Sequence, residues 1–449
     1  MIVPFTTDQI LTLAPDAASA KAGQQLAKAT NWQNLGADAN AVWGECQGSG
    51  KQPYRVQVEI AAPAFKCTCP SRKFPCKHGL ALLLLNTSEG ALFAATNAPP
   101  WVTDWLASRQ QRAERVVAKS TAAEEPLTAE QLAAKAAAQA RRGAERNSRV
   151  TAGLVELQKW LDDLAREGFA TLRSRGLKPW DEMAALLVDA QAPGVANRLR
   201  RASAWPFLAG VADWEKCLAR DLARLYLFCK TATAGDALDA HDIKALLGTA
   251  IRQEDVMGGA AVADNWRVIA QRTTDEPPMR VRANWLQGER TRRYALVLQF
   301  AQKSLGFDRQ LLPATAFEGE LAFYPGAAPI RALIKTQQAV RPVSIALSPE
   351  DDPWALQAAL LAANPFATET PLTLRATPQL HGNRFHLMLS AGTLPLHPQF
   401  QQGWPLLALS GGAPLKVFGE WDGDSFFPLS TQANTRLVNL DDIVQQIAA

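Results

Sequence analysis

The chain has 449 residues, of which 47% are hydrophobic and 20% are charged, a composition typical of globular proteins and not of disordered or fibrous ones. At roughly 150 residues per domain, this length predicts about three domains. The net charge is only +4, so the total charge alone does not indicate a nucleic-acid-binding protein.

Two further features bear on the location of the protein. No apolar run approaches the ~20 residues that a membrane-spanning helix needs. Six cysteines in this length are too few for a disulfide scaffold, and such sparse usage favours a reducing compartment. We therefore expect a cytoplasmic protein that does not enter a membrane.

Residues 1–106 predict a small domain of mixed structure. The pattern favours a helix over residues 16–28, followed by extended runs over residues 41–47 and 54–60, with Gly48-Ser49-Gly50 as the turn between them. A second helix is expected over residues 77–85. The predicted order is a β-hairpin, a loop and a helix.

The loop of this domain contains the most informative residues of the chain. Three cysteines and one histidine follow the spacing C-x-C, six residues, C-x-H: Cys67, Cys69, Cys76 and His78. Three thiolates and one imidazole fill the tetrahedral shell of a structural zinc ion, whereas a catalytic zinc keeps one position open. A disulfide is disfavoured, because three cysteines leave one unpaired and the compartment is reducing. The spacing therefore predicts one structural zinc ion.

This order of ligands resembles the SWIM-type zinc finger. The resemblance covers about residues 54–90, including the extended run before the first cysteine and the helix after the histidine. It implies zinc at the same four residues, and it suggests either DNA binding or protein–protein interaction. It implies nothing about the rest of the chain.

Four cations lie in or beside the motif: Lys66, Arg72, Lys73 and Lys77. They could contact the phosphates of a nucleic acid, because such contacts release counterions. They could also offset the net charge of −1 that three thiolates and Zn²⁺ carry together. Both interpretations are open at this point.

Residues 107–150 differ in composition from the rest of the chain. They carry nine basic and five acidic side chains, a net charge of +4 that equals the net charge of the whole chain. They include no aromatic residue. Thr128 with Gln131 forms a capping box, and the alanines over residues 133–140 favour a helix. Because alanine buries little surface, such a helix has little reason to dock. We predict a basic linker that is partly helical.

Residues 151–260 predict a helical domain. A first helix places leucines at helical spacing and ends at Gly168; these are Leu154, Leu157, Leu161 and Leu164. A second helix begins at Pro179. A third has the apolar positions Leu218, Leu222, Leu225 and Cys229. The pattern is typical of a small helical bundle.

Along residues 261–449, the spacing of the apolar residues changes toward a period of two, which is typical of strands. Residues 280–285 and 294–298 predict one hairpin, residues 372–374 and 385–388 a second, and Asp422-Gly423 marks a third. One helix is expected over residues 353–363, preceded by acidic residues that suit its positive end. The pattern indicates a β-rich carboxy-terminal domain.

Other clusters have simpler interpretations. Three histidines, His381, His386 and His397, have no cysteine or carboxylate at the close spacing of a second metal site. The three remaining cysteines, Cys46, Cys217 and Cys229, suit small buried positions. Two groups of arginines, around residues 198–201 and 290–293, are interpreted as solvated faces, with a binding surface as the alternative.

Together these patterns predict a multidomain α+β protein with a small ββα zinc-finger module, a basic linker, a helical bundle and a β-rich domain. No phosphate-binding loop or nucleophile motif is found, which favours a protein without enzymatic activity and without a small-molecule substrate. The first hypothesis is a finger that binds DNA. The alternative is a protein-interaction scaffold, suggested by the near-neutral charge of residues 151–449 and by their many tryptophans.

Overall fold

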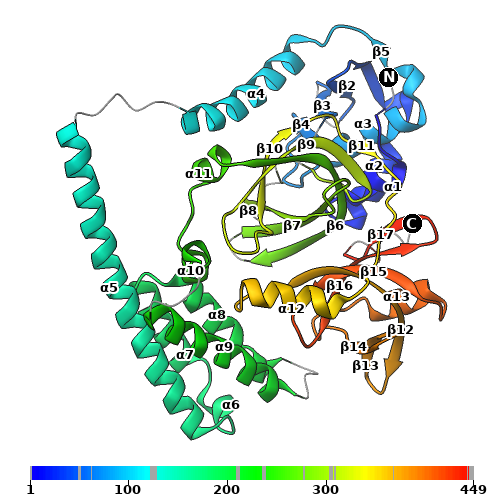
Figure 1. Ribbon diagram of the computed structural model, residues 1–449. Coiled ribbons are helices and arrows are strands. Elements are labelled where there is room, and N and C mark those ends of the chain that lie inside the picture. The colour runs from blue at the N-terminus through cyan, green and yellow to red at the C-terminus, as the bar shows by residue number, and fades with distance from the viewer. Residues whose placement is uncertain are drawn as a thin grey trace.

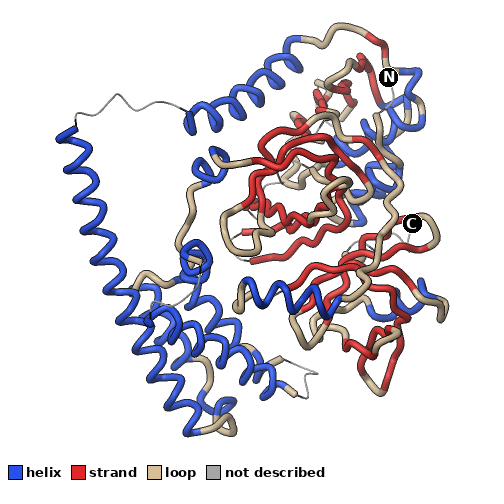
Figure 2. Tube along the Cα trace, viewed as in Figure 1, coloured by secondary structure: helices blue, strands red, loops and turns tan. Residues whose placement is uncertain are grey.

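A computed structural model describes the chain over residues 3–48, 52–61, 63–121, 129–208, 213–234, 239–276, 279–302, 307, 310–367, 369–441 and 443. The long helix α5 (Ala129–Glu167) and helices α6–α10 (within residues 172–247) gather in one part of the molecule, whereas three sheets with further helices beside them occupy the rest (Figures 1 and 2). The expected multidomain α+β architecture is therefore confirmed. The turn predicted at Ser49-Gly50 and the cap predicted at Thr128 lie outside the described residues.

The amino-terminal domain is built on a five-stranded sheet of order β4-β3-β2-β1-β5. Its strands are β1 Trp32–Ala37, β2 Ala41–Cys46, β3 Tyr54–Glu59, β4 Ala64–Cys67 and β5 Ala94–Ala95. Its helices are α1 Thr7–Thr12, α2 Ala17–Leu26 and α3 Lys77–Ser88. Helix α2 begins where the Asp16 carboxylate accepts a hydrogen bond from the Ser19 backbone N–H at 2.7 Å. Helix α3 is apolar on all sides and packs against both α2 and the sheet.

Two helices follow in the region predicted as a linker. They are α4 Pro100–Thr121 and α5 Ala129–Glu167, the long cyan helix of Figure 1. The sequence predicts a change from linker to bundle at residue 150, but α5 runs through that position without interruption. No proline separates the alanine-rich part from the leucine-rich part, so one continuous helix forms. The same helix thus contains the end of the basic segment and the start of the bundle.

The bundle consists of the second half of α5 and the helices that follow it. These are α6 Leu172–Arg175, α7 Lys178–Asp189, α8 Pro193–Ser203, α9 Trp214–Ala234 and α10 Ala240–Leu247. The leucines that the sequence places at helical spacing on α5 and α9 are buried in one common core. Helix α5 ends at Glu167, and Gly168 directly after it has a left-handed φ of 75°. The short helix α11 Gln253–Gly258 then leads to the next domain.

Residues 261–342 form a six-stranded antiparallel sheet. Its strands are β6 Ala261–Glu276, β7 Met279–Gly288, β8 Tyr294–Gln302, β9 Thr315–Phe323, β10 Ala332–Gln337 and β11 Arg341–Pro342. The sheet curves so that β8 and β10 approach each other, and the Leu296 N–H donates to the Ile330 carbonyl at 2.9 Å. The predicted pairing of residues 280–285 with 294–298 is present as β7 and β8.

Residues 370–439 form a second six-stranded sheet, of order β14-β13-β12-β15-β16-β17. Its strands are β12 Thr370–His381, β13 Arg384–Leu389, β14 Gly392–Pro395, β15 Leu415–Trp421, β16 Phe426–Ala433 and β17 Arg436–Asn439. Two helices accompany it, α12 Pro353–Ala363 and α13 Gly403–Ser410. The region expected as one β-rich domain therefore contains two sheets, each with buried residues of its own.

The cores of the domains are joined in three places. Buried residues of α3, such as Leu80 and Leu82, belong to the same apolar cluster as Trp266 and Phe317 of the first six-stranded sheet. The two six-stranded sheets meet around another cluster, in which the Trp285 and Phe418 rings pack edge to face at 5.8 Å. The bundle core is separate from these two clusters, but Phe366, from the segment between α12 and β12, packs into it against Phe228 with ring centroids 5.5 Å apart. The finger is therefore supported by the β-structure and not by the bundle.

Candidate metal centre

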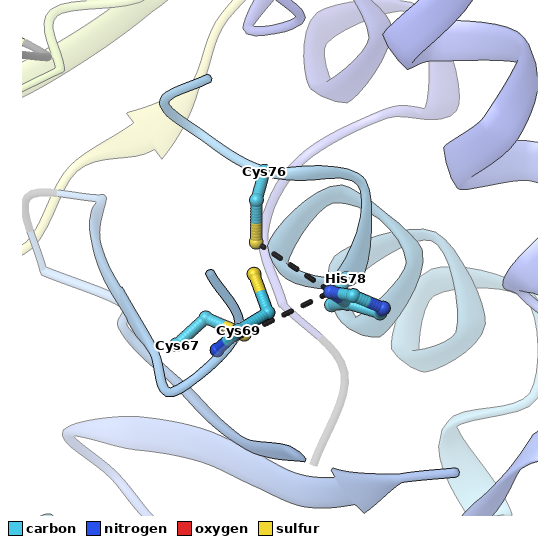
Figure 3. A group of neighbouring side chains, drawn as sticks. All are labelled: Cys67, Cys69, Cys76 and His78. Atoms are coloured by element: carbon cyan, nitrogen blue, oxygen red, sulfur yellow. Dashed lines mark hydrogen bonds between the residues drawn. The ribbon is translucent and has the colours of Figure 1, made fainter. Parts of the chain in front are cut away.

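Three neighbouring segments of the amino-terminal domain bring four donor side chains together (Figure 3). Strand β4 ends at Cys67, and Cys69 follows two residues later. Cys76 is the N-cap residue of α3, and His78 lies in the first turn of that helix. The strand end and the helix start therefore face each other across the loop. The structure brings together all four residues that the spacing indicates.

The distances among these side chains fit a single metal ion. The four ligand atoms all lie within 4.8 Å of one another. The Nδ1 atom of His78 is 3.9 Å from the Sγ atom of Cys67 and 3.9 Å from the Sγ atom of Cys76. In a tetrahedral zinc site, nitrogen and sulfur ligands are about 3.5 Å apart, because their bonds to the metal are about 2.0 and 2.3 Å long. The donor set and its spacing therefore fit zinc.

The centre is partly shielded from water. Cys76 and His78 are buried, whereas Cys67 and Cys69 are half-buried. The His78 ring packs against Tyr54 of β3, with ring centroids 5.1 Å apart. This contact restricts the orientation of the imidazole ring. Tyr54 was not predicted as a site residue, since an aromatic residue in a strand is more often part of an apolar core.

Hydrogen bonds within the cluster shift the pKa values of its members in different directions. The Cys69 backbone N–H points to the Cys67 sulfur at 3.5 Å. Side-chain hydrogen bonds with Cys67 and Cys76 lower the pKa of Cys69, while the same coupling raises the pKa of Cys67. Burial lowers the pKa of His78, but hydrogen bonds to Cys69 and Cys76 outweigh it and raise the pKa to about 9. Because zinc binds thiolates and a neutral imidazole, binding of the ion requires Cys67 and His78 to release their protons, against these two raised pKa values.

Gly79, directly after the histidine, allows close packing behind the centre. A Cβ atom at this position would lie 2.8 Å from Cδ1 of Phe65, which is nearer than van der Waals contact allows. Phe65 in turn packs edge to face on Phe74 of the cysteine loop, with centroids 6.1 Å apart. The loop, strand β4 and helix α3 are therefore connected by aromatic packing as well as by the four donors.

The four predicted cations of the finger are all exposed. Lys73 forms an ion pair with Asp16, the cap of α2, at 2.8 Å. Lys66, Arg72 and Lys77 form no ion pair with the described residues. Three cations of the finger thus face solvent beside the cluster.

The remaining cysteines and the three carboxy-terminal histidines do not form a second cluster among the described residues. Burial raises the pKa of Cys46 to about 11 and that of Cys229 to about 12, as expected for unreactive thiols in a core. Cys217 is half-buried. The His381 and His386 rings lie 6.2 Å apart and edge to face, which is ring packing and not ligation of one ion.

Comparison with protein families identifies the module. The family model of the SWIM zinc finger matches residues 54–86, a range that contains β3, β4, the cysteine loop and most of α3. The chain contains a SWIM-type zinc finger. The sequence-based resemblance is thereby confirmed, and together with the donor cluster it supports zinc binding by this protein.

A second family model extends the SWIM relationship beyond the finger. The SWIM-associated four-helix bundle domain matches residues 145–249, from the middle of α5 to the end of α10. The helical bundle predicted from leucine spacing is therefore a domain that accompanies SWIM fingers. No curated protein and no solved structure matches the chain. Within the described residues, no helix combines the length and apolarity needed to cross a membrane.

Proposed function

We propose that one zinc ion, held by Cys67, Cys69, Cys76 and His78, has a structural role in the SWIM finger. Three sulfurs and one nitrogen fill a tetrahedral shell and leave no position for a substrate. The ion joins the end of β4 to the start of α3 and so fixes the loop between them. In this proposal the finger is not catalytic, and the protein acts in the cytoplasm through what it binds.

We propose further that the finger contacts the phosphate backbone of DNA. The observation that carries this proposal is the exposure of Lys66, Arg72 and Lys77 without ion pairs to described residues. A cation already held by a carboxylate gains little from a phosphate, whereas an exposed unpaired cation releases counterions when it meets one. These three side chains are therefore the contacts that the proposal assigns, with Lys73 as a weaker contributor because of its pairing with Asp16.

Fluorescence anisotropy with duplex and single-stranded DNA at low ionic strength tests this assignment. We expect salt-dependent binding by the zinc-loaded chain, and weaker binding by an Arg72→Gln, Lys77→Gln double variant. Loss of two phosphate contacts reduces the slope of log K against log salt by about 1.8 for duplex DNA. Lys178→Gln is the control for loss of a surface cation, because Lys178 is exposed on α7 of the bundle, where it forms an ion pair with Glu182 at 3.8 Å.

The zinc content of the double variant distinguishes the two roles considered for these cations, contact with phosphates and neutralisation of the thiolate charge. If the cations serve DNA, the double variant keeps its zinc and loses affinity for DNA. If they instead offset the charge of the thiolates, the variant loses zinc to a chelator more readily than the parent protein does. Unchanged DNA binding by the double variant, or no salt-dependent binding by the parent chain, overturns the DNA proposal.

A protein-interaction role is the second candidate, and helix α12 favours it. This helix has no charged residue, and none of its residues is buried. Leu356 on α12 is 37% exposed, and Trp354, which packs edge to face on Trp421, is 40% exposed. An apolar helix in this state suits contact with another protein. A partner that co-purifies with the parent chain and a Leu177→Lys control, but not with Leu356→Lys, would support this role.

A further inference from the structure

A second charged feature lies far from the finger along the chain, where the bundle meets helix α11. An open cavity of about 960 Å³ is present there, between α5, α10 and the start of α11. Its charged lining residues are Arg146, His241, Lys244, Arg252 and Asp255. Three are permanent cations and one is a carboxylate. The lining therefore carries a net positive charge before any contribution from the histidine.

The structure holds one cation of this cavity in a fixed position. The Nη2 atom of Arg146 donates to the Thr249 hydroxyl at 2.6 Å. This bond spans 103 residues and connects α5 to the segment that follows α10. It uses one of the five N–H groups of the guanidinium. The side chain is thus held at the cavity wall with donors left for a ligand.

Lys244 supplies the second cation. It is exposed on α10 and forms no ion pair with the described residues. The nearby carboxylates have other partners. Asp255 accepts two hydrogen bonds from the Arg252 guanidinium, both at 3.2 Å. Asp242 accepts a hydrogen bond from the Ala327 backbone N–H at 3.1 Å. Among the described residues, neither Arg146 nor Lys244 thus forms an ion pair with a carboxylate.

The cationic surface continues along α5 beyond the cavity. Arg142 and Arg149 lie one turn before and one turn after Arg146, at the spacing that places residues on neighbouring turns of one side of a helix. Both are exposed. A ligand with more than one phosphate could thus extend from the cavity along the helix.

We propose that this cavity binds phosphate groups, with Arg146 and Lys244 as the principal contacts. A guanidinium with a planar fork and a lysine as a point charge are the usual cationic partners of phosphate oxygens. The phosphate belongs either to a nucleic-acid backbone or to a free polyphosphate or nucleotide, since the same contacts serve both. This inference does not depend on DNA binding by the finger, because the two surfaces share no residue.

Isothermal titration of the full, zinc-loaded chain with pyrophosphate and with a single-stranded DNA oligonucleotide tests the proposal. We expect Lys244→Met to weaken binding of at least one probe about tenfold, the loss typical of one charge-assisted contact. Lys178→Met is the control and should bind as the parent does. Lys244 is exposed and unpaired with described residues, so its substitution should leave the melting temperature unchanged.

The two probes separate the sources of phosphate. Loss of pyrophosphate binding in Lys244→Met identifies a free phosphate compound, whereas loss restricted to DNA identifies the nucleic-acid backbone. A variant with Arg72→Gln and Lys77→Gln in the finger retains the binding at this cavity in either case. Equal binding by the parent, Lys244→Met and Lys178→Met, or no binding of either probe at low ionic strength, overturns the inference.

Discussion

The Nδ1 atom of His78 lies 3.9 Å from the Sγ atom of Cys67, although eleven positions separate the two residues. One residue ends a strand and the other begins a helix. Hydrophobic burial alone does not account for this approach, because Cys67 is only half-buried at the edge of the apolar core. A metal ion does account for it, since one ion can bind both atoms and release the free energy that closes the loop.

Substitution of a ligand should therefore remove the metal and loosen the loop. Cys69→Ser or His78→Ala is expected to lose the bound zinc and to expose the peptide bonds after Arg72 and Lys73 to trypsin. Elemental analysis of purified protein measures the first effect, and limited proteolysis measures the second. Removal of zinc from the parent chain by a chelator should produce the same cleavage.

Cys217→Ser is the matched control, because Cys217 is also half-buried but lies on α9 outside the cluster. It should keep the metal content and protease resistance of the parent. The structural-zinc interpretation would be wrong if carefully prepared parent protein held less than about a tenth of a zinc ion per chain. It would also be wrong if Cys69→Ser kept full metal content.

Gly79→Ala should destabilise the finger without removing a ligand. The new methyl group would meet the Phe65 ring at 2.8 Å, so the ring or the start of α3 must move. We expect a loss of about 1–3 kcal/mol in the free energy of unfolding, the range for overpacked cores. Gly143→Ala on α5 is the control, because nothing lies within 4 Å of its added methyl group. Urea denaturation should show no destabilisation for that variant, and equal midpoints for both variants would contradict the packing argument.

The local features of the finger were predictable because their signals are local. The C-x-C and C-x-H pairs lie in one short loop, and the strand before it and the helix after it follow from alternation and from an apolar run. The contact of Tyr54 with His78 was not predictable in this way. It depends on the register of β3 against β4, which pairs Val56 with Cys67 and which no short segment specifies.

The turn between β7 and β8 provides a test of pH dependence. Burial raises the pKa of Asp264, but hydrogen bonds from the backbone and hydroxyl of Thr291 and from the Arg290 N–H outweigh it and leave the pKa below its usual 3.8. A carboxylate with a lowered pKa stabilises the fold above its unfolded pKa, and this stabilisation is lost as the pH falls through the folded value. The stability difference between the parent and Asp264→Asn should therefore be present at neutral pH and should shrink below pH 3.8.

Asp264→Ala should cost more than Asp264→Asn at neutral pH, about 2–4 kcal/mol, because it removes the buried acceptor of the Arg290 and Thr291 backbone N–H groups. Thermal unfolding followed across the acid range measures both variants. A difference from the parent that stays constant from neutral pH to below pH 3.8 would show that the carboxylate charge contributes nothing.

The features that the sequence does not predict depend on contacts between segments far apart in the chain. Residues 372–374 are expected to pair with residues 385–388, but they pair with β15, and β13 pairs with residues 377–381. The two hairpins themselves, which turn at residues 289–293 and 382–383, were predictable from alternation and turn residues. Their assignment to two separate sheets was not, since alternation shows which face of a strand is buried and not which sheet it joins. The same holds for α5, where an alanine-rich segment and a leucine-rich segment differ in composition but share one helix.

The core shared by the finger and the first six-stranded sheet also changes which domains we expect to loosen when zinc is lost. From composition alone, the helical and β-rich regions are expected to stay folded when the finger opens, because each has apolar faces of its own. In the structure, Leu80 of α3 and Phe317 of β9 belong to one apolar cluster, and the Val340 N–H donates to the Ala61 carbonyl at 3.2 Å. Loosening of α3 should therefore weaken the first six-stranded sheet, whereas the bundle, with a separate core around Leu157 and Leu199, should be unaffected.

Hydrogen exchange with and without a chelator measures which elements loosen when zinc is removed. We expect faster exchange in α3 and, to a smaller extent, in β6 and β9 after zinc removal, because exchange reports local opening of each cooperative unit. Amides of α8 and α9 should exchange at unchanged rates, since none of their buried side chains belongs to the finger's cluster. Faster exchange in the bundle, or no change in β9 when α3 has opened, would show that the continuous core does not couple these domains energetically.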